Sequence, residues 1–185
     1  MELRQGMRQL IISGLGGQGV LFVTRLLADA ALDMGLSVLI SETHGMAQRG
    51  GNVISHLKVA PKDGGQPLVS PLIRPGRADI LLALHQEAIK VHGHFLAPEG
   101  KAFVNSPCPV EKGYAFDATA AASTLSSPVS ANVVLLGFAS ASGALFCEPD
   151  RIESVLKAYG GKRLDLSLRA FRIGCEAFRD PSTSH

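Results

Sequence analysis

An apolar run passes directly into a glycine-rich loop in the stretch Leu10-Ile11-Ile12-Ser13-Gly14-Leu15-Gly16-Gly17-Gln18-Gly19. The consecutive apolar residues predict a buried strand that stops at glycine. The glycines fit the pattern G-x-G-x-x-G, and the largely apolar residues 20–34 predict a helix directly after them. A strand, a tight turn and a helix N-terminus together favour a bound phosphate or dinucleotide. The same glycines are also compatible with a turn that only packs closely against its neighbours.

A second polar loop follows the next strand-like run, Val38-Leu39-Ile40. This loop spans residues 43–51 and places His44, Gln48 and Arg49 among glycines. Arg49 is suited to clamp a phosphate or carboxylate through its planar fork of donors. The alternative is that these side chains bond to nearby backbone and shape an interface. Because α/β proteins place their sites at the carboxyl ends of strands, we expect the two strands to lie side by side with both loops at one sheet edge.

The predicted binding residues come from both loops, and Glu42 at the end of the second strand is placed to bind a ribose if the ligand is a dinucleotide. No Ser/His/Asp arrangement stands out, so no catalytic residue is predicted. No metal site is predicted either, because His92 and His94 are two apart on a helix and face different directions. The expected cofactor-binding residues are Gly14, Gly16, Gly17, Gln18, Gly19, Thr43, His44, Gln48, Arg49, Gly50, Gly51 and Asn52.

Two further polar residues have simpler interpretations. His56 alternates with Ile54 and Lys58 along a strand, which predicts a surface or interface position. Cys108 lies between two prolines with no base near it in sequence, so it is interpreted as an ordinary thiol.

Strands alternate with helices along the chain, which predicts the α/β class, with a three-layer α/β/α sandwich around a Rossmann-like, mixed but mostly parallel sheet in a single domain. The strand at 53–59 should be antiparallel or lie at an edge, because only about ten residues precede it and a parallel crossover needs a dozen or more. The domain should cover residues 1–180, followed by a loose tail at 181–185. Further strands are expected at 79–84 and 102–105, and helices at 85–95, 117–125, 131–146, 149–159 and 164–178.

Composition narrows the class of protein. The chain has 185 residues, of which 46% are hydrophobic, and its net charge is +2. Such a balanced charge gives no reason to expect nucleic acid or an anionic membrane surface as a partner. The three cysteines are widely spaced, which is typical of a reduced, cytoplasmic protein and leaves too few thiolates for a four-cysteine iron–sulfur cluster. The longest apolar run, 131–146, is too short to span a membrane.

The two loops together resemble the gamma-subunit domain of 2-oxoacid:ferredoxin oxidoreductases. The resemblance rests on the glycine loop, on residues 42–56 and on Ser70-Pro71-Leu72-Ile73. It continues through Asn132-Val133-Val134-Leu135-Leu136-Gly137 and Leu168-Arg169-Ala170-Phe171, so it covers nearly the whole chain. The form Gly45-Met46-Ala47-Gln48-Arg49-Gly50-Gly51 looks most like the small (beta) subunit of the indolepyruvate-type enzymes.

The resemblance implies a reaction class and a set of partners. In such enzymes a 2-oxoacid is decarboxylated on thiamine diphosphate, electrons pass through iron–sulfur clusters to ferredoxin, and the acyl group goes to coenzyme A. This chain has no cluster-binding cysteine set and no Gly-Asp-Gly run. Thiamine diphosphate, magnesium and the clusters are therefore expected on partner subunits. This chain is expected to be inactive alone, with a coenzyme A contact as a hypothesis.

Two other functions remain open at this point. The chain could be a free-standing NAD(P)-binding Rossmann oxidoreductase, which predicts nicotinamide binding by the isolated chain. It could also be a non-enzymatic adaptor subunit whose glycine loop is purely structural. Expressed alone, it is expected to self-associate as a homo-oligomer through apolar surface intended for partners.

Overall fold

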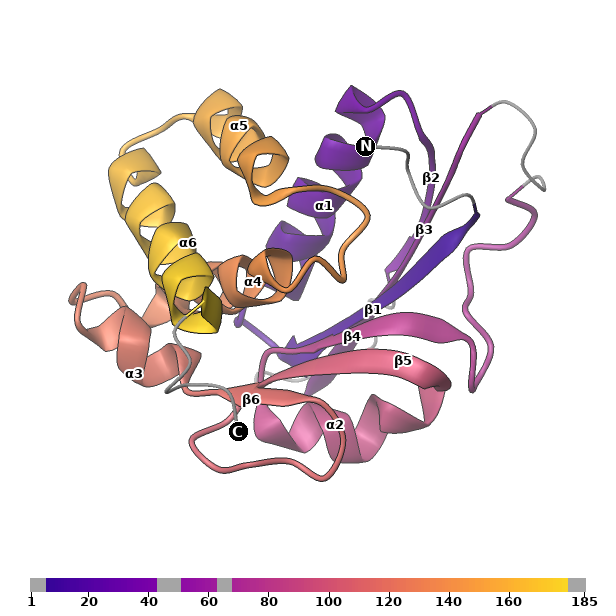
Figure 1. Cartoon of the computed structure of the whole chain (residues 1–185), viewed down its shortest axis with the longest axis horizontal. Helices are drawn as coiled ribbons and strands as arrows, with labels where there is room; N and C mark the ends of the chain where they lie inside the picture. Colours follow the sequence, from indigo (N-terminus) through magenta and orange to yellow (C-terminus); the bar gives the residue numbers. More distant parts are fainter. Residues whose placement is uncertain (1–5, 43–50, 63–67, 180–185) are drawn as a thin grey trace.

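A computed structural model describes residues 6–42, 51–62 and 68–179 of the chain, and Figure 1 shows its arrangement. The described residues form one six-stranded sheet in the order β2-β3-β1-β4-β5-β6. β3 is antiparallel to both of its neighbours, and the remaining pairs are parallel, as the sequence predicted. The strands are β1 (Arg8–Leu15), β2 (Ser37–Glu42), β3 (Asn52–Ala60), β4 (Ala78–Ala83), β5 (Leu96–Asn105) and β6 (Tyr114–Phe116).

Helices cover the two faces of this sheet unequally (Figure 1). One face carries most of them, and the other carries α2 and a short 3₁₀ turn, η1. The larger face holds α1 (Val20–Asp33), α3 (Ala118–Ser123), α4 (Ala131–Ala141), α5 (Pro149–Tyr159) and α6 (Leu164–Arg179), with η2 (Pro128–Ser130) before α4. The smaller face holds α2 (Gln86–His92) and η1 (Gly93–Phe95). The arrangement confirms the predicted three-layer class.

The predicted neighbourhood of β1 and β2 is wrong, because β3 lies between them. The residues between β2 and β3 are too few for a parallel crossover, so β3 turns back antiparallel along β2. It thereby occupies the position next to β1, where Gly14 pairs with Val53 and Leu15 with Asn52. β1 and β2 still run in the same direction, so their carboxyl ends share one edge.

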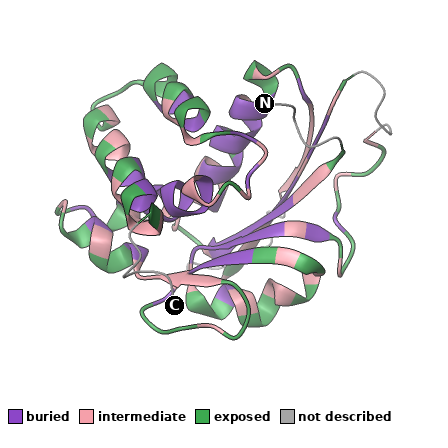
Figure 2. Ribbon diagram, viewed as in Figure 1, coloured by how far each residue is buried: buried purple, intermediate pink, exposed green. Residues whose placement is uncertain are grey.

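The core follows the alternation of side chains along β1. Leu10 and Ile12 are fully buried towards the larger helical layer, whereas Ile11 is fully buried towards α2. In Figure 2 the buried residues are concentrated on the central strands and on the sheet-facing sides of α1 and α4. Among the described residues, no helix combines the length and the apolar character needed to cross a membrane.

Two glycines explain why α4 and α6 lie so close. A Cβ on Gly137 would collide with the carbonyl oxygen of Phe171, and one on Gly174 would collide with that of Val134. α4 is shorter than the predicted 131–146, because the chain leaves the helix at Ser142 and adopts a positive φ of 66° at Gly143. The helices beginning at Pro149 and Leu164 are confirmed.

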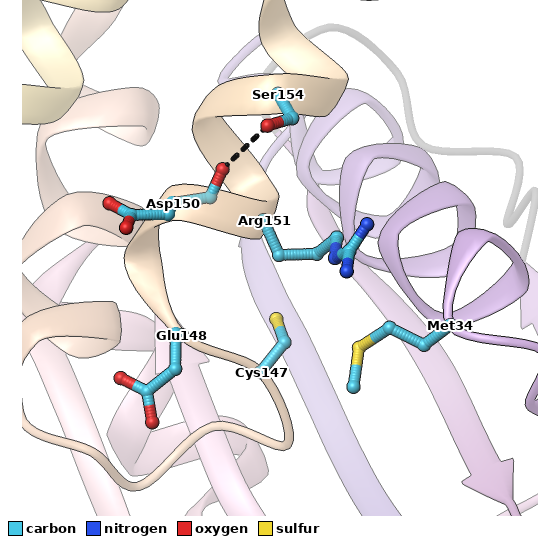
Figure 3. A pocket seen from close by; sticks show the side chains of 6 residues that line it. All are labelled: Met34, Cys147, Glu148, Asp150, Arg151 and Ser154. Carbon is cyan, nitrogen blue, oxygen red and sulfur yellow. Dashed lines mark hydrogen bonds between the residues drawn. The ribbon is translucent and has the colours of Figure 1, made fainter. Parts of the chain in front are cut away.

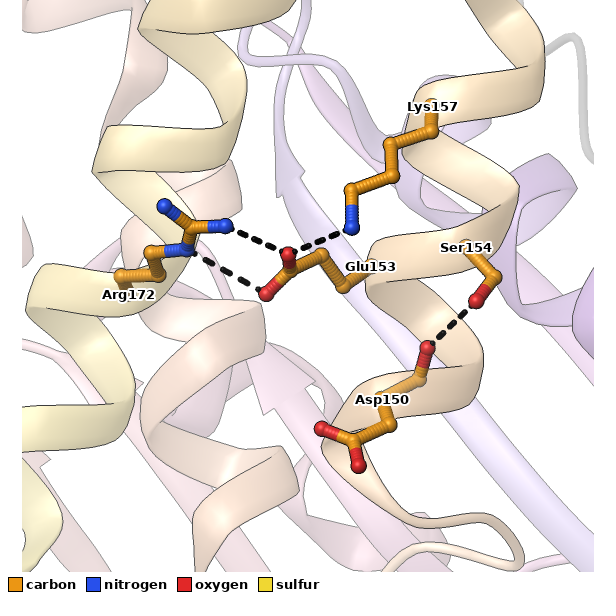
Figure 4. Close-up of polar contacts among 5 residues, drawn as sticks. All are labelled: Asp150, Glu153, Ser154, Lys157 and Arg172. Carbon is orange, nitrogen blue, oxygen red and sulfur yellow. Dashed lines mark hydrogen bonds and ion pairs between the residues drawn. The ribbon is translucent and has the colours of Figure 1, made fainter.

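The outer helices α5 and α6 are linked by an ion-pair network (Figure 4). Glu153 on α5 accepts a hydrogen bond from Nη2 of Arg172 on α6 at 2.6 Å, and Lys157 lies 2.9 Å away on the other side. These two cations lower the pKa of Glu153 to about 2. The hydrogen bond from Arg172 is the largest cause, and the hydrogen bond from Lys157 is the next. Tyr159 at the end of α5 also donates to Asp29 of α1.

Candidate functional site

The described ends of both predicted loops meet at the carboxyl edge of the sheet. The N–H of Gly16, just after β1, donates to the carbonyl oxygen of Gly51, just before β3, at 2.9 Å. Glu42 ends β2 at the same edge, where it pairs with Ser55. The expectation that the loops share one edge is therefore confirmed for these ends. Thr43, His44, Gln48, Arg49 and Gly50 lie outside the described residues.

Part of the glycine loop is occupied by bonds within the loop itself. The backbone N–H of Leu15 donates to the side-chain oxygen of Gln18 at 2.7 Å, and the N–H of Gln18 donates back to Leu15 at 3.1 Å. Gly14 makes room for this contact, because a Cβ there would lie 2.8 Å from that side-chain oxygen. Gln18 thus shapes the turn. The exposed Gly17 and the first turn of α1 keep N–H groups with no acceptor among the described residues.

A second helix begins beside the loop. Gly19 caps α1 with a left-handed backbone, φ 81°, and a Cβ there would collide with the side-chain nitrogen of Asn132. Asn132 stands in the first turn of α4, so the N-termini of α1 and α4 converge at this point. Asn132 was quoted in the family resemblance but not predicted as a site residue. No local pattern marks it, because only the folded chain brings α4 to α1.

The starts of α1 and α4 differ from those of α2 and α3 in how they are capped, although α5 also begins without a side-chain cap. His85 accepts a hydrogen bond from the N–H of Glu87 at the start of α2, and Asp117 accepts one from Ala120 at the start of α3. Neither α1 nor α4 has a side-chain cap, but in α4 the N–H of Ala131 donates to the carbonyl oxygen of Pro128 and that of Val133 to the side-chain oxygen of Asn132. The first turn of α1 therefore offers free N–H donors, and both helix starts carry partial positive charge, which favours an anion. The geometry of the loop therefore fits a phosphate or carboxylate.

The same geometry fits a dinucleotide poorly. In the dinucleotide-binding fold the acid that binds the ribose ends the strand next to the glycine strand. Here Glu42 ends β2, which β3 separates from β1. One extra strand spacing adds about 4.8 Å between that carboxylate and the glycine loop. Asn52, also in the predicted set, is exposed at the start of β3 and closer to the loop than β2 is.

His56 and His92 lie on the α2 side of the sheet. The prediction that His56 is at a surface or interface is wrong, because only 4% of it is exposed. It accepts a hydrogen bond from the N–H of Ile73, and its ring packs edge-on against Phe95 at 5.3 Å between centroids. His92 lies 2.6 Å from the hydroxyl of Ser13, the residue before Gly14. Burial is the main cause of a lowered pKa in both histidines.

A cavity of about 340 Å³ lies at the opposite end of α1, and Figure 3 shows its lining. Cys147 is 7% exposed there, and burial, with nearby Glu148, raises the pKa of its thiol to about 12. The thiol therefore stays protonated and a poor nucleophile. Among the described residues, no group of three or more His, Cys, Asp or Glu could hold a metal ion. The other lining residues are Met34, Asp150, Arg151 and Ser154.

Comparison with known sequences identifies relatives along almost the whole chain. The sequence profile of the family described as pyruvate ferredoxin/flavodoxin oxidoreductase matches residues 9–177. The indolepyruvate oxidoreductase subunit IorB of Thermococcus kodakarensis is 29% identical over 198 aligned positions, which cover 92% of this chain and 96% of that subunit. These matches agree with the resemblance found in the two loops.

Two solved structures share the fold. One is the gamma subunit of a keto/oxoacid ferredoxin oxidoreductase from Geobacter sulfurreducens, with a TM-score of 0.77 and 24% identity, covering 97% of this chain and 99% of that one. The other is a 2-oxoglutarate:ferredoxin oxidoreductase from Magnetococcus marinus with 2-oxoglutarate, coenzyme A and succinyl-CoA bound. Its TM-score is 0.79 at 20% identity, covering 98% of this chain and 32% of that one. Both likenesses confirm the predicted α/β fold.

Proposed function

The chain belongs to the pyruvate ferredoxin/flavodoxin oxidoreductase family, and we propose that it is the small, gamma-type subunit of a 2-oxoacid:ferredoxin oxidoreductase. The complex would decarboxylate a 2-oxoacid oxidatively, pass the acyl group to coenzyme A and give the electrons to ferredoxin. The form of residues 45–51 favours the indolepyruvate-type branch. We infer that the complex works in the cytoplasm, because the cysteines of this chain are sparse and widely spaced.

The role proposed for this chain is to bind and orient, while the chemistry takes place on its partners. Thiamine diphosphate, magnesium and the iron–sulfur clusters are assigned to other subunits, where the thiamine group would supply the decarboxylation chemistry. Within this chain, the convergence of α1 and α4 at Gly19 and Asn132 supports a contact with an anionic group of coenzyme A. Arg49 of the second loop is proposed to complete that contact.

The two alternative functions are less well supported. A free-standing NAD(P) enzyme needs a ribose-binding acid beside the glycine strand, and β3 occupies that position. A purely structural adaptor would not require the unpaired N–H groups that Gly17 and the first turn of α1 present at this edge. The arrangement at Gly19 therefore favours a ligand-contacting subunit.

Purification of the native chain from its own cells tests the complex. We expect it to elute with a larger, brown subunit that contains thiamine diphosphate and iron–sulfur clusters. A colourless chain that elutes alone and binds NAD tightly would overturn the proposal.

Titration of the assembled enzyme with coenzyme A tests the contact separately. We expect Arg49→Ala to raise the KM for coenzyme A about tenfold, because a charge-assisted hydrogen bond to an anion contributes about 1.5–3 kcal/mol. Arg163→Ala is the control, since Arg163 is an exposed arginine just before α6. An unchanged KM in Arg49→Ala would remove Arg49 from the site while leaving the subunit assignment intact.

A further inference from the structure

Residues 68–75 form a segment, here called the strap, that lies against the α2 side of the sheet without regular structure. Its Ile73 is 2% exposed and packs into the apolar cluster between the sheet and α2. The residues immediately after the strap are held by backbone bonds from Gly76 and Arg77 to η1, each 2.9 Å. The end of the strap is therefore anchored by backbone hydrogen bonds, whose strength does not depend on pH.

One hydrogen bond holds the strap to the sheet. Within the described part of the chain, the only hydrogen bond to residues 68–75 runs from the N–H of Ile73 to Nδ1 of His56, at 3.1 Å. To accept this bond, the imidazole must be neutral and carry its proton on Nε2. An imidazolium has no acceptor, so protonation of His56 breaks the bond and leaves the buried N–H of Ile73 without a partner.

The surroundings of His56 oppose its protonation. Lys58 on β3 and His92 on α2 both disfavour a positive charge on His56, and His94 in η1 does the same to His92. The strap contributes Arg74, which acts on Lys58. The partners of His56 in register on the flanking strands, Ile11 and Ser41, carry no charge. Every titratable or charged group named here is basic.

We propose that His56 is a pH-sensitive tie for the strap, holding residues 68–75 against the sheet at neutral pH and releasing them on acidification while the rest of the fold persists. Burial lowers the pKa of His56 below 6.5, and His92 and then Lys58 lower it further. His56 therefore binds a proton more readily when the strap is released than when it is docked. The docking free energy is complete above pH 6.5 and is lost as the pH falls through the lowered pKa. Val69 and Leu72 of the strap are already 86% and 55% exposed, so little of their surface has to leave the sheet on release.

Two measurements on the full chain test the tie. NMR titration of the His56 ring from pH 8 to 4.5 gives its protonation midpoint, and amide hydrogen exchange gives the protection factor of Ile73 at each pH. We expect both to change at the same pH, with protection of Ile73 falling at least tenfold. Protection of Leu135, fully buried in α4, should not change. Equal loss at Leu135 would mean global unfolding and would overturn the proposal.

Two variants sharpen the test. His56→Asn keeps an acceptor where Nδ1 stood but does not titrate, so protection of Ile73 should become independent of pH. His92→Asn can still bond Ser13 but removes a like charge, so release should move to higher pH. If protection of Ile73 falls in His56→Asn as it does in the natural chain, or if His56 stays neutral to pH 4.5, the tie is excluded. If a variant does not fold, the natural chain alone tests the tie, because the pH of His56 protonation and the pH at which Ile73 loses protection must coincide.

Discussion

Asn132 and Gly19 depend on each other at the point where α1 and α4 meet. Gly19 has a positive φ and also faces the side-chain nitrogen of Asn132, whereas Gly17 has a positive φ, 94°, and open space around it. A methyl group at Gly17 therefore meets only backbone strain. A methyl group at Gly19 meets the same strain and a collision. Comparing Gly17 with Gly19 therefore separates the effect of the positive φ from the effect of the collision with Asn132.

We predict that Gly17→Ala lowers the free energy of unfolding by about 1–2 kcal/mol through strain alone. Gly19→Ala should cost about 1–3 kcal/mol more, because Asn132 must also move. Urea denaturation of both variants measures the difference.

The double variant Gly19→Ala with Asn132→Ala completes the cycle. It should recover the collision part of the loss and leave the strain, giving a coupling energy of about 1 kcal/mol or more. Equal costs for Gly17→Ala and Gly19→Ala, or no recovery in the double variant, would show that Asn132 does not press on the loop.

At the scale of helices, the Glu153 network is the link between α5 and α6 that depends on pH. The pKa of Glu153 is lowered from 4.5 to about 2, so the unfolded chain takes up protons first as the pH falls. Its contribution to stability is therefore complete above pH 4.5 and is lost as the pH falls through 2. Only 18% of the Glu153 side chain is exposed, but Arg172 and Lys157 are 55% and 56% exposed, so solvent screens the network and its contribution stays in the range of a surface ion pair.

We predict that Glu153→Gln lowers the Tm by roughly 2–4 °C at pH 7. The gap to the natural chain should narrow as the pH falls from 4.5 towards 2. Glu87→Gln is the matched control, because Glu87 pairs with Lys90 inside α2 alone and its side chain is 48% exposed. Calorimetry across this pH range measures both, and a gap that stays constant down to pH 2 would contradict the assignment.

Local sequence patterns predicted the elements whose causes are local. The start of α1 follows from the glycine loop, and the start of α5 follows from Pro149. The antiparallel direction of β3 follows from the short connection before it. The place of β3 between β2 and β1 could not be predicted, because either side of β2 satisfies the same connection. β6 has only three residues and exists through its pairing with β5, as in Phe103 with Tyr114.

The candidate site was predictable to a similar extent. The glycine motif located the turn and the helix N-terminus, and the folded chain confirmed that Gly51 meets Gly16. Asn132 was missed because it is more than a hundred residues from Gly19 along the chain. His56 was predicted to be at a surface or interface because strand alternation shows only which side of the sheet a residue faces. Whether that side is covered depends on the strap and Phe95.

At the scale of the whole molecule, the carboxyl edge of the sheet is the face expected to meet the catalytic subunit. It carries the glycine loop, the start of β3 and the uncapped starts of α1 and α4. Val129, 60% exposed in η2 directly before α4, adds an apolar side chain beside this edge. Leu32 is similarly exposed, 54%, but lies near the other end of α1, about 20 Å away along the helix.

We predict that Val129→Glu reduces assembly with the co-expressed thiamine-binding subunit at least about tenfold, because a carboxylate buried at an interface without a partner costs more than about 1.4 kcal/mol. Leu32→Glu introduces the same charge at similar exposure and should assemble within about twofold of the natural chain. Affinity capture followed by size-exclusion chromatography measures both. The two Tm values should remain close to that of the natural chain, since exposed substitutions usually change stability by about 0.5 kcal/mol or less. If Leu32→Glu blocks assembly and Val129→Glu does not, the partner docks at the opposite end of α1, and the glycine loop faces solvent.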